Sequence, residues 1–220
     1  MKIKNLLAVA ALCLFSSTAS AQCRDYNGIY FQYNPTIVGN LDQQPYNYDN
    51  VLANAFTMGY VRSIPISSKI PFFLEVGGNL SYGFKSEANK TLTIHNMAFN
   101  IPVNFGYSFG LGSERLALNP YVGLRMRLNF LAMGTYSNDR DNINLLSSDD
   151  WAKYNWSSDY TWNVFQLGIQ AGVKFIINKH FIVEASYTYD VIPLGKCYIS
   201  KGADDYLYPM SINFGFGFCW

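Results

Sequence analysis

Hydrophobic and polar residues alternate with a period of two along several stretches of this chain. This period is typical of β-strands, in which successive side chains point to opposite faces. The C-terminal stretch is the clearest example, because five large apolar residues alternate there with small or polar ones: Ile212, Phe214, Phe216, Phe218 and Trp220. The pattern recurs and predicts strands near residues 26–37, 52–64, 72–84, 97–107, 121–130, 164–175, 181–191 and 211–220.

The strand and connection lengths predict a barrel that crosses a membrane. About ten residues at ~3.3 Å rise, tilted by about 45°, cover roughly 23 Å, close to the ~25 Å apolar band of an outer-membrane barrel. The odd-numbered gaps (38–51, 85–91, 131–160 and 192–206) are mostly longer than the even-numbered ones (65–70, 109–119 and 177–180). Long external loops and short periplasmic turns produce this asymmetry. We therefore predict an all-β fold, an eight-stranded antiparallel up-and-down transmembrane β-barrel with both termini on the periplasmic side.

Alternation by itself does not say which face of each strand is outside, because a soluble lipocalin-like barrel has the same period. The volume of the interior decides between the two. An eight-stranded barrel holds only a few layers of side chains, about a dozen residues. The clearest strands carry many more large apolar residues than that on one face. We therefore predict that the apolar face contacts lipid and that the polar, glycine-rich face lines the lumen.

This orientation directs six charged side chains into the lumen: Glu75, Arg125, Arg127, Lys174, Glu184 and Asp190. Buried charges are tolerated when they are paired and hydrogen-bonded. The favoured interpretation is a salt-bridge network that fills and rigidifies the barrel. The alternative is a solute pathway, although eight strands leave little continuous aqueous channel.

Aromatic residues gather where the two membrane interfaces would lie, which is typical of aromatic girdles. The ordinary preference of aromatic residues for strands is the alternative explanation. The expected external set is Tyr46, Tyr48, Trp151, Tyr154, Trp156, Tyr160, Trp162, Tyr206 and Tyr208, and the expected periplasmic set is Tyr26, Phe72, Tyr107, Phe175 and Trp220.

The N-terminus resembles a secretory signal peptide. A start with Lys2 and Lys4 precedes an apolar run over residues 6–15 and an Ala-x-Ala site that ends at Ala21. This order predicts cleavage after Ala21, so that residues 1–21 are the signal peptide and residues 22–220 are the barrel domain. The apolar run is shorter than the roughly 20 residues of a spanning helix. A buried N-terminal helix is the alternative.

Cleavage would leave Cys23, Cys197 and Cys219 in an exported chain, where disulfides persist. The first and last strands of a closed barrel are neighbours, and Cys23 and Cys219 both fall near their periplasmic ends. A disulfide between these two would lock the closing seam. The alternative is that Cys23 lies in an unpaired N-terminal tail.

Composition and motifs exclude several classes of function. The chain has 16 Lys and Arg against 15 Asp and Glu, so it lacks the basic excess of a nucleic-acid-binding protein. We expect no cofactor and no metal site, because no phosphate-binding loop, metal-spaced Cys/His set or G-x-S-x-G motif is present. His95, at the external end of the fourth strand, has no Ser at a spacing that suits a lipid-modifying acyl enzyme. We therefore do not expect an enzyme.

Three short motifs resemble the PorT-like family of outer-membrane β-barrel domains, which is related in shape to OmpA-type and OmpX-type barrels. Residues 99–107 (FNIPVNFGY) resemble its IPL-x-x-x-Y strand, residues 119–124 (NPYVGL) its PY-x-G strand, and residues 184–187 (EASY) its E-x-x-Y strand. The cysteine pair and the long third loop depart from the family pattern. The resemblance implies a barrel in the outer membrane of a Gram-negative cell.

The alternating C-terminal strand with terminal Trp220 is similar to the signal read by the barrel assembly machinery, because an exposed final strand can pair edge-on with a partner. We expect a structural or surface-interaction role, in which the external loops contact lipopolysaccharide or an unknown protein partner. A narrow channel is the main alternative. A lipid-modifying outer-membrane enzyme and a soluble lipocalin-like binder are the others.

Overall fold

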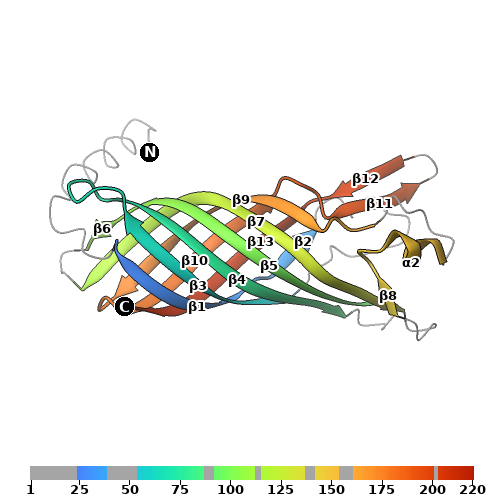
Figure 1. Ribbon diagram of the computed structural model, residues 1–220, viewed down its shortest axis with the longest axis horizontal. Helices are drawn as coiled ribbons and strands as arrows, with labels where there is room; N and C mark the ends of the chain where they lie inside the picture. The colour runs from blue at the N-terminus through green and yellow to red at the C-terminus, as the bar shows by residue number, and fades with distance from the viewer. Residues whose placement is uncertain are drawn as a thin grey trace, which may run out of the picture.

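The computed structural model describes residues 24–38, 54–86, 92–111, 115–136, 142–153, 161–200 and 203–220. Within these ranges, eight antiparallel strands form a barrel, which the pairing of the first strand with the last closes (Figure 1). In chain order they are β1 (Tyr26–Tyr33), β3 (Asn54–Pro65), β4 (Phe72–Ser86), β5 (Leu92–Tyr107), β7 (Leu116–Tyr136), β9 (Phe165–Ile177), β10 (Phe181–Asp190) and β13 (Pro209–Cys219). The predicted fold class and strand order are confirmed.

Shorter elements extend the barrel at both ends. β2 (Thr36–Val38) pairs with β13, while β6 (Phe109–Gly110) and β8 (Asn142–Asn144) pair with β7. β8 is followed by α2 (Ser148–Lys153), and β11 (Gly195–Ser200) and β12 (Ala203–Leu207) form a separate hairpin. In Figure 1, β8, α2, β11 and β12 lie at one end, the long-loop end, and the C-terminus lies at the other, the short-turn end. Among the described residues, no helix has the length and hydropathy needed to cross a membrane.

The strands differ from the prediction in length, and a β-bulge explains the largest difference. β7 has 21 residues and β5 has 16, instead of about ten. β5 pairs Met97 with Leu131 but Ala98 with Asn129, so that Phe130 is an extra residue in β7. A bulge shifts the alternation by one residue. The period-two pattern therefore stops at Phe130, although the strand continues to Tyr136 as part of the predicted loop 131–160.

The connection between β9 and β10 is a tight turn of three residues. The amide of His180 donates to the carbonyl of Ile177 at 3.1 Å, and Asn178 and Lys179 have φ angles of 53° and 63°. Positive φ at both central positions is the requirement of a type I′ turn, whose twist matches that of the flanking strands. This turn fixes the register in which β9 and β10 pair.

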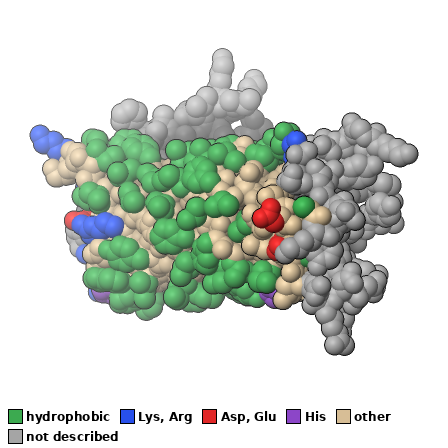
Figure 2. Space-filling model, turned by 45° about the vertical axis from the view of Figure 1, so that its right-hand side comes forward, with side chains coloured by type: hydrophobic (Ala, Val, Ile, Leu, Met, Phe, Trp, Pro, Cys, Tyr) green, Lys and Arg blue, Asp and Glu red, His purple; other side chains and the backbone are tan. Residues whose placement is uncertain are grey.

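The apolar face of the strands is the outer wall of the barrel, as predicted. Large hydrophobic side chains on alternate positions are exposed, with Phe216 at 67% and Met58 at 65% as the extremes. The polar residues between them are buried: Asn100, Asn129, Gln166 and Asp190 are at most 3% exposed. Figure 2 shows the hydrophobic side chains as a broad band over the wall. A barrel with an apolar outer wall and a polar interior suits lipid as its surroundings.

One residue of the predicted periplasmic aromatic girdle, Tyr26, does not face the membrane. Tyr26 is 4% exposed and points into the lumen, where its hydroxyl donates to Glu75 Oε2 at 2.7 Å. The signal was in the sequence, because Tyr26 has the opposite parity to the outward-facing Ile29 and Phe31. Of the external set, Trp162 is partly buried against loop residues, and Tyr46, Tyr48, Tyr154, Trp156 and Tyr160 lie outside the described residues.

Candidate functional site

The interior of the barrel is closed at the short-turn end by an apolar plug. Its most deeply buried members come from six strands and are at most 4% exposed: Tyr26, Val61, Ala117, Ile176, Ile182 and Cys219. Ile176 and Ile182 pair directly, close to the β9–β10 turn, which places the plug at that end. Phe73 is fully buried nearby and lies over Gly106, where a Cβ atom would overlap its ring. The glycine therefore allows a large ring to fill the narrow lumen.

Above the plug lies an acid–lysine cluster of Glu75, Lys174 and Glu184, from β4, β9 and β10. The ammonium of Lys174 lies 2.5 Å from Glu75 Oε1 and 3.9 Å from Glu184 Oε2. Two carboxylates surround one cation, and neutral donors complete their coordination. Tyr26 and Asn104 donate to Glu75, and the Tyr121 hydroxyl donates to Glu184.

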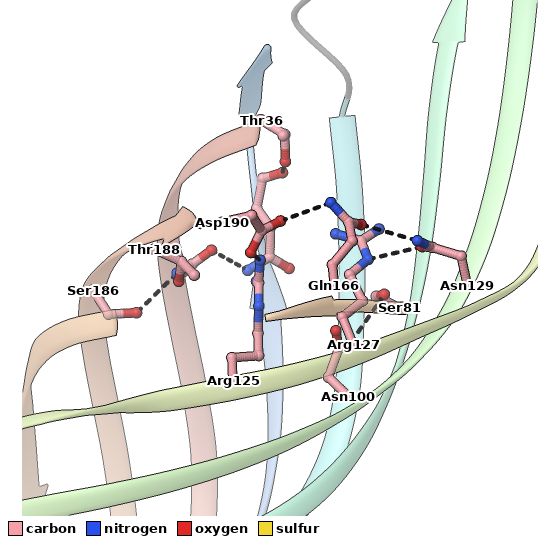
Figure 3. Close-up of polar contacts among 12 residues, drawn as sticks. Thr36, Ser81, Asn100, Arg125, Arg127, Asn129, Gln166, Ser186, Thr188 and Asp190 are labelled. Atoms are coloured by element: carbon pink, nitrogen blue, oxygen red, sulfur yellow. Dashed lines mark hydrogen bonds and ion pairs between the residues drawn. The ribbon is translucent and has the colours of Figure 1, made fainter. Parts of the chain in front are cut away.

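An arginine cluster of Arg125, Arg127 and Asp190 lies farther along the lumen. Arg125 Nη2 is 2.8 Å from Asp190 Oδ1, and this carboxylate is fully buried. A chain of amides connects Asp190 to the second arginine: Gln166 donates to Asp190, Asn129 donates to Gln166, and Arg127 Nε donates to Asn129 at 3.0 Å. Figure 3 shows the two arginine side chains rising together from β7, one toward Asp190 and the other toward Asn129.

Amide and hydroxyl groups fill the remaining lumen in two further sets. Asn100 donates to Asn79 and Ser81, and Asn79 in turn donates to the hydroxyl of Tyr30. On the other side of the barrel, the Asn213 amide donates to Ser186 and Thr188 and accepts from Asn34, which also accepts a bond from Thr57. Sequence reasoning selected the charged residues and missed these partners, although they share the inward parity.

Both charged clusters line one small cavity. It has about 40 Å³ of room for the centres of water-sized molecules. One water needs roughly 10–15 Å³ by this measure, so the cavity has room for only a few. The six predicted lumen residues therefore all face the interior, but they form two clusters rather than one continuous network. Among the charged groups that the structure describes, Lys174 pairs with Glu75 and Glu184, and Arg127 is bound to an amide instead of a carboxylate.

At the long-loop end, the loops after β7 and β10 are joined to each other. Asn163, in the loop after β7, donates from its backbone amide to the Leu194 carbonyl at 2.6 Å and from its side chain to the Pro193 carbonyl at 2.8 Å, and both acceptors are in the loop after β10. Within the loop after β7, the amide of Trp162 donates to the Leu145 carbonyl at 2.8 Å. Ala132, Ile143 and Leu145 form an apolar cluster beneath, against which Ile94, Leu146 and Trp162 pack. These contacts hold the described parts of two external loops as one unit.

The two histidines lie at opposite ends of the barrel. His95 Nδ1 is 2.7 Å from the Tyr82 hydroxyl, and the two rings stack with centroids 6.0 Å apart. His180 stacks on Phe218, with ring centroids 5.5 Å apart, and its Nδ1 lies 3.2 Å from the Cys219 carbonyl. Both arrangements anchor an aromatic pair at the end of a strand.

The last strand presents all five residues of the predicted assembly signal on the outer wall. Ile212, Phe214, Phe216, Phe218 and Trp220 are between 43% and 67% exposed. Cys219, between two of them, is buried, and its Sγ donates to the Lys179 carbonyl at 3.3 Å. Cys23 lies outside the described residues, so the Cys23–Cys219 disulfide stays a prediction.

A family model for the outer membrane protein beta-barrel domain matches residues 7–218. The chain belongs to this family. As an outer membrane β-barrel domain, it has its apolar wall in the outer membrane, and the polar clusters described above form its interior. No curated protein matches the chain.

Solved structures similar to this outer membrane β-barrel domain share little sequence with it. Ail, the attachment invasion locus protein of Yersinia pestis, is 15% identical, with a TM-score of 0.45, 90% of this chain covered and 99% of Ail. Neisserial surface protein A is 15% identical, with a TM-score of 0.43 and coverage of 88% and 95%. The outer membrane enzyme PagL is 11% identical, with a TM-score of 0.45 and coverage of 86% and 97%.

Proposed function

We propose that this outer-membrane barrel is a rigid scaffold that presents its joined external loops to a binding partner. The observation that supports it most is the filled lumen. An apolar plug closes one end, and two hydrogen-bonded charge clusters leave a cavity of only about 40 Å³. A filled interior resists deformation and passes no solute. The exposed loops are therefore the regions that can bind a partner.

The ligand class proposed for the loops is lipopolysaccharide or a protein at the cell surface. The connected loops after β7 and β10 form a platform of fixed shape, since the backbone and side-chain amides of Asn163 tie them together. A preorganised surface loses little conformational entropy when a partner binds. The role proposed is non-enzymatic, and the related motifs of the PorT-like family agree with an outer-membrane scaffold.

The biogenesis proposed for the chain has two steps. Residues 1–21 direct export and are removed after Ala21, and the outward-facing residues of β13 are then read by the barrel assembly machinery. The exposure of all five side chains on one face of β13 supports the second step, because a partner strand could contact them together.

Three measurements test the scaffold proposal. Membrane fractionation reports the location, heat-modifiable gel mobility reports the folded barrel, and planar-bilayer recording reports conductance. We expect the protein in the outer-membrane fraction, a faster band before boiling than after, and no stable single-channel steps. Stable conductance steps would favour the narrow channel instead. Loss of a lipid A modification in a His95→Ala variant, relative to wild type, would favour the enzyme. A monomer that stays dissolved without detergent would contradict the whole topology.

The surface role has its own experiment. The β11–β12 hairpin is replaced by a short Gly-Ser turn, and amide hydrogen exchange of both proteins is measured in nanodiscs with and without lipopolysaccharide. We expect lipopolysaccharide to slow exchange in the loops of the wild-type protein and to have a smaller effect on the variant. Equal protection in both lipid compositions would contradict lipopolysaccharide as the ligand.

A further inference from the structure

The charges in the lumen balance over the whole barrel but not within each cluster. The acid–lysine cluster has two carboxylates and one ammonium, and the arginine cluster has two guanidinium groups and one carboxylate. A charge in a low-dielectric interior is costly unless it is compensated nearby. The arginine cluster therefore has one positive charge without a local counter-charge.

The hydrogen bonds identify Arg127 as the under-compensated group. A guanidinium has five N–H donors. Arg127 uses Nε on the amide oxygen of Asn129, and its terminal nitrogens have no protein acceptor among the described residues. Arg125 reaches Asp190, but its own Nε is buried without a hydrogen-bond partner. Asp190 is thus held by Arg125 and is not shared with Arg127.

The space beside Arg127 is small and lined by further donors. Arg125 and Arg127 both line the cavity of about 40 Å³, which also has donors such as Tyr30 on its wall. The carboxylates Glu75 and Glu184 line it as well, and both contact Lys174. The Tyr30 hydroxyl accepts a bond from Asn79, which leaves its own proton available to donate. Arg127 therefore brings unused guanidinium N–H donors and an uncompensated positive charge to the wall of a small cavity, which is what an anion requires of its site.

We propose that the lumen binds one small inorganic monovalent anion, of the halide class, against Arg127. The anion supplies the missing negative charge and accepts the guanidinium N–H bonds that the protein leaves unused. The size of the cavity selects against large organic anions. This site is independent of the proposed surface role, because it lies inside the barrel.

A salt-exchange experiment on the refolded barrel tests the site. The full mature chain is refolded in detergent in sodium bromide or in sodium gluconate at equal ionic strength, so that the anion is present while the lumen closes. The thermal unfolding midpoint is then followed by heat-modifiable mobility. We expect bromide to raise the midpoint relative to gluconate, with a dependence on concentration that saturates. Equal midpoints, or a higher one in gluconate, would overturn the proposal.

Two variants separate site binding from general salt effects. Arg127→Gln removes the proposed ligand, and we expect it to lose the bromide-dependent shift. Arg62→Gln removes a cation that pairs with Asp25 outside the lumen, where the two side chains are 38% and 60% exposed, and we expect it to retain the shift. The same bromide shift in Arg127→Gln as in wild type would overturn the proposal.

Anomalous diffraction from wild-type crystals grown with bromide needs no variant and therefore stands even if Arg127→Gln does not fold. The expected result is a bromide peak within hydrogen-bonding distance of the Arg127 terminal nitrogens. An ordered water there, without an anomalous signal, would show that hydration alone satisfies the guanidinium and would reject the site.

Discussion

At the scale of single residues, the interior is arranged so that each large or charged side chain faces a small or polar one. Phe73 lies over Gly106, and Asp190 lies over Gly168, where a Cβ atom would overlap the carboxylate. The charged groups act in the same way, because each buried carboxylate has a cation or a hydroxyl donor in contact. Two substitutions test these local fits.

The first substitution is Gly106→Ala. Its new methyl group would overlap the Phe73 ring, and overpacking of this kind typically costs about 1–3 kcal/mol. We expect a lower free energy of unfolding in urea titrations of the barrel in detergent. The control is Gly83→Ala, whose Cβ atom would lie 3.6 Å from the nearest atom, in Ala55, so little change is expected. Equal stability of the two variants would contradict the close fit.

The second substitution is Lys174→Met, which leaves Glu75 and Glu184 without their cation. Removal of one partner from a buried ion pair costs about 3–5 kcal/mol. An exposed pair contributes about 0–1 kcal/mol, so Arg62→Met, which breaks the contact with Asp25, is the matched control. Urea unfolding compares the two. A double variant, Glu75→Gln with Lys174→Met, is expected to regain part of the loss, and no recovery would contradict direct coupling of the two groups.

At the scale of secondary-structure elements, turns and bulges decide where each strand lies relative to its neighbours. The bulge at Phe130 keeps the outer half of β7 in register with β5, and the β9–β10 turn aligns Ile176 with Ile182 in the apolar plug. The last strand contributes an exposed aromatic face that ends at Trp220. A turn substitution and a C-terminal substitution test these elements.

Lys179→Gly is expected to stabilise the protein. The φ angle of Lys179 is 63°, a left-handed conformation that a lysine adopts at a cost and glycine adopts freely. A left-handed conformation costs an L-residue roughly 1–2 kcal/mol, and the greater freedom of glycine in the unfolded chain offsets part of the relief, so a modest rise of the urea midpoint is expected. The control is Lys179→Ala, which removes the long side chain but keeps Cβ, and no gain is expected from it. A gain of equal size in both variants would refute the conformational explanation.

Trp220→Ser is expected to lower the amount of barrel assembled in the outer membrane of living cells. Trp220 is 57% exposed, and within the described part of the chain its ring stacks on Phe218, so that its loss removes little internal packing. Folding of the purified variant from urea into detergent should therefore match that of wild type. The two measurements together separate recognition from folding. Failure of both would indicate a structural role for Trp220 instead.

At the scale of the whole molecule, the barrel is a cylinder closed by its seam and filled along its axis. The seam pairs β1 with β13, and Gly28 lies opposite Cys219. Lysine, arginine and acid side chains from distant strands join across the lumen, while apolar clusters occupy both ends. A disulfide at this seam would stabilise the closed state.

Intact-mass analysis tests the proposed Cys23–Cys219 disulfide. Alkylation of the denatured mature chain without reductant is expected to modify Cys197 alone, and reduction is expected to expose two further thiols. The disulfide would contribute roughly 2–4 kcal/mol, so the urea midpoint should fall on reduction. A Cys197→Ser variant with two alkylated thiols before reduction would disprove the pairing.

The sequence by itself determined the strands and their two faces. Period-two alternation marks the outward positions directly, and the limited interior volume decides that the bulky apolar face must point to lipid. The same parity would have placed Tyr26 and Phe73 inside. These properties depend only on residues that are close in the chain, so the sequence shows them without a structure.

Only the tertiary structure decided which interior groups meet. Lys174 and Glu75 are 99 residues apart, and Arg125 and Asp190 are 65 residues apart. Their contacts depend on the tilt of the strands and on the stagger between neighbours, which turns and bulges set. Inward parity is therefore readable from the sequence, but the separation of the lumen into two clusters, with Arg127 left beside a cavity, follows from the way the closed barrel brings distant strands together.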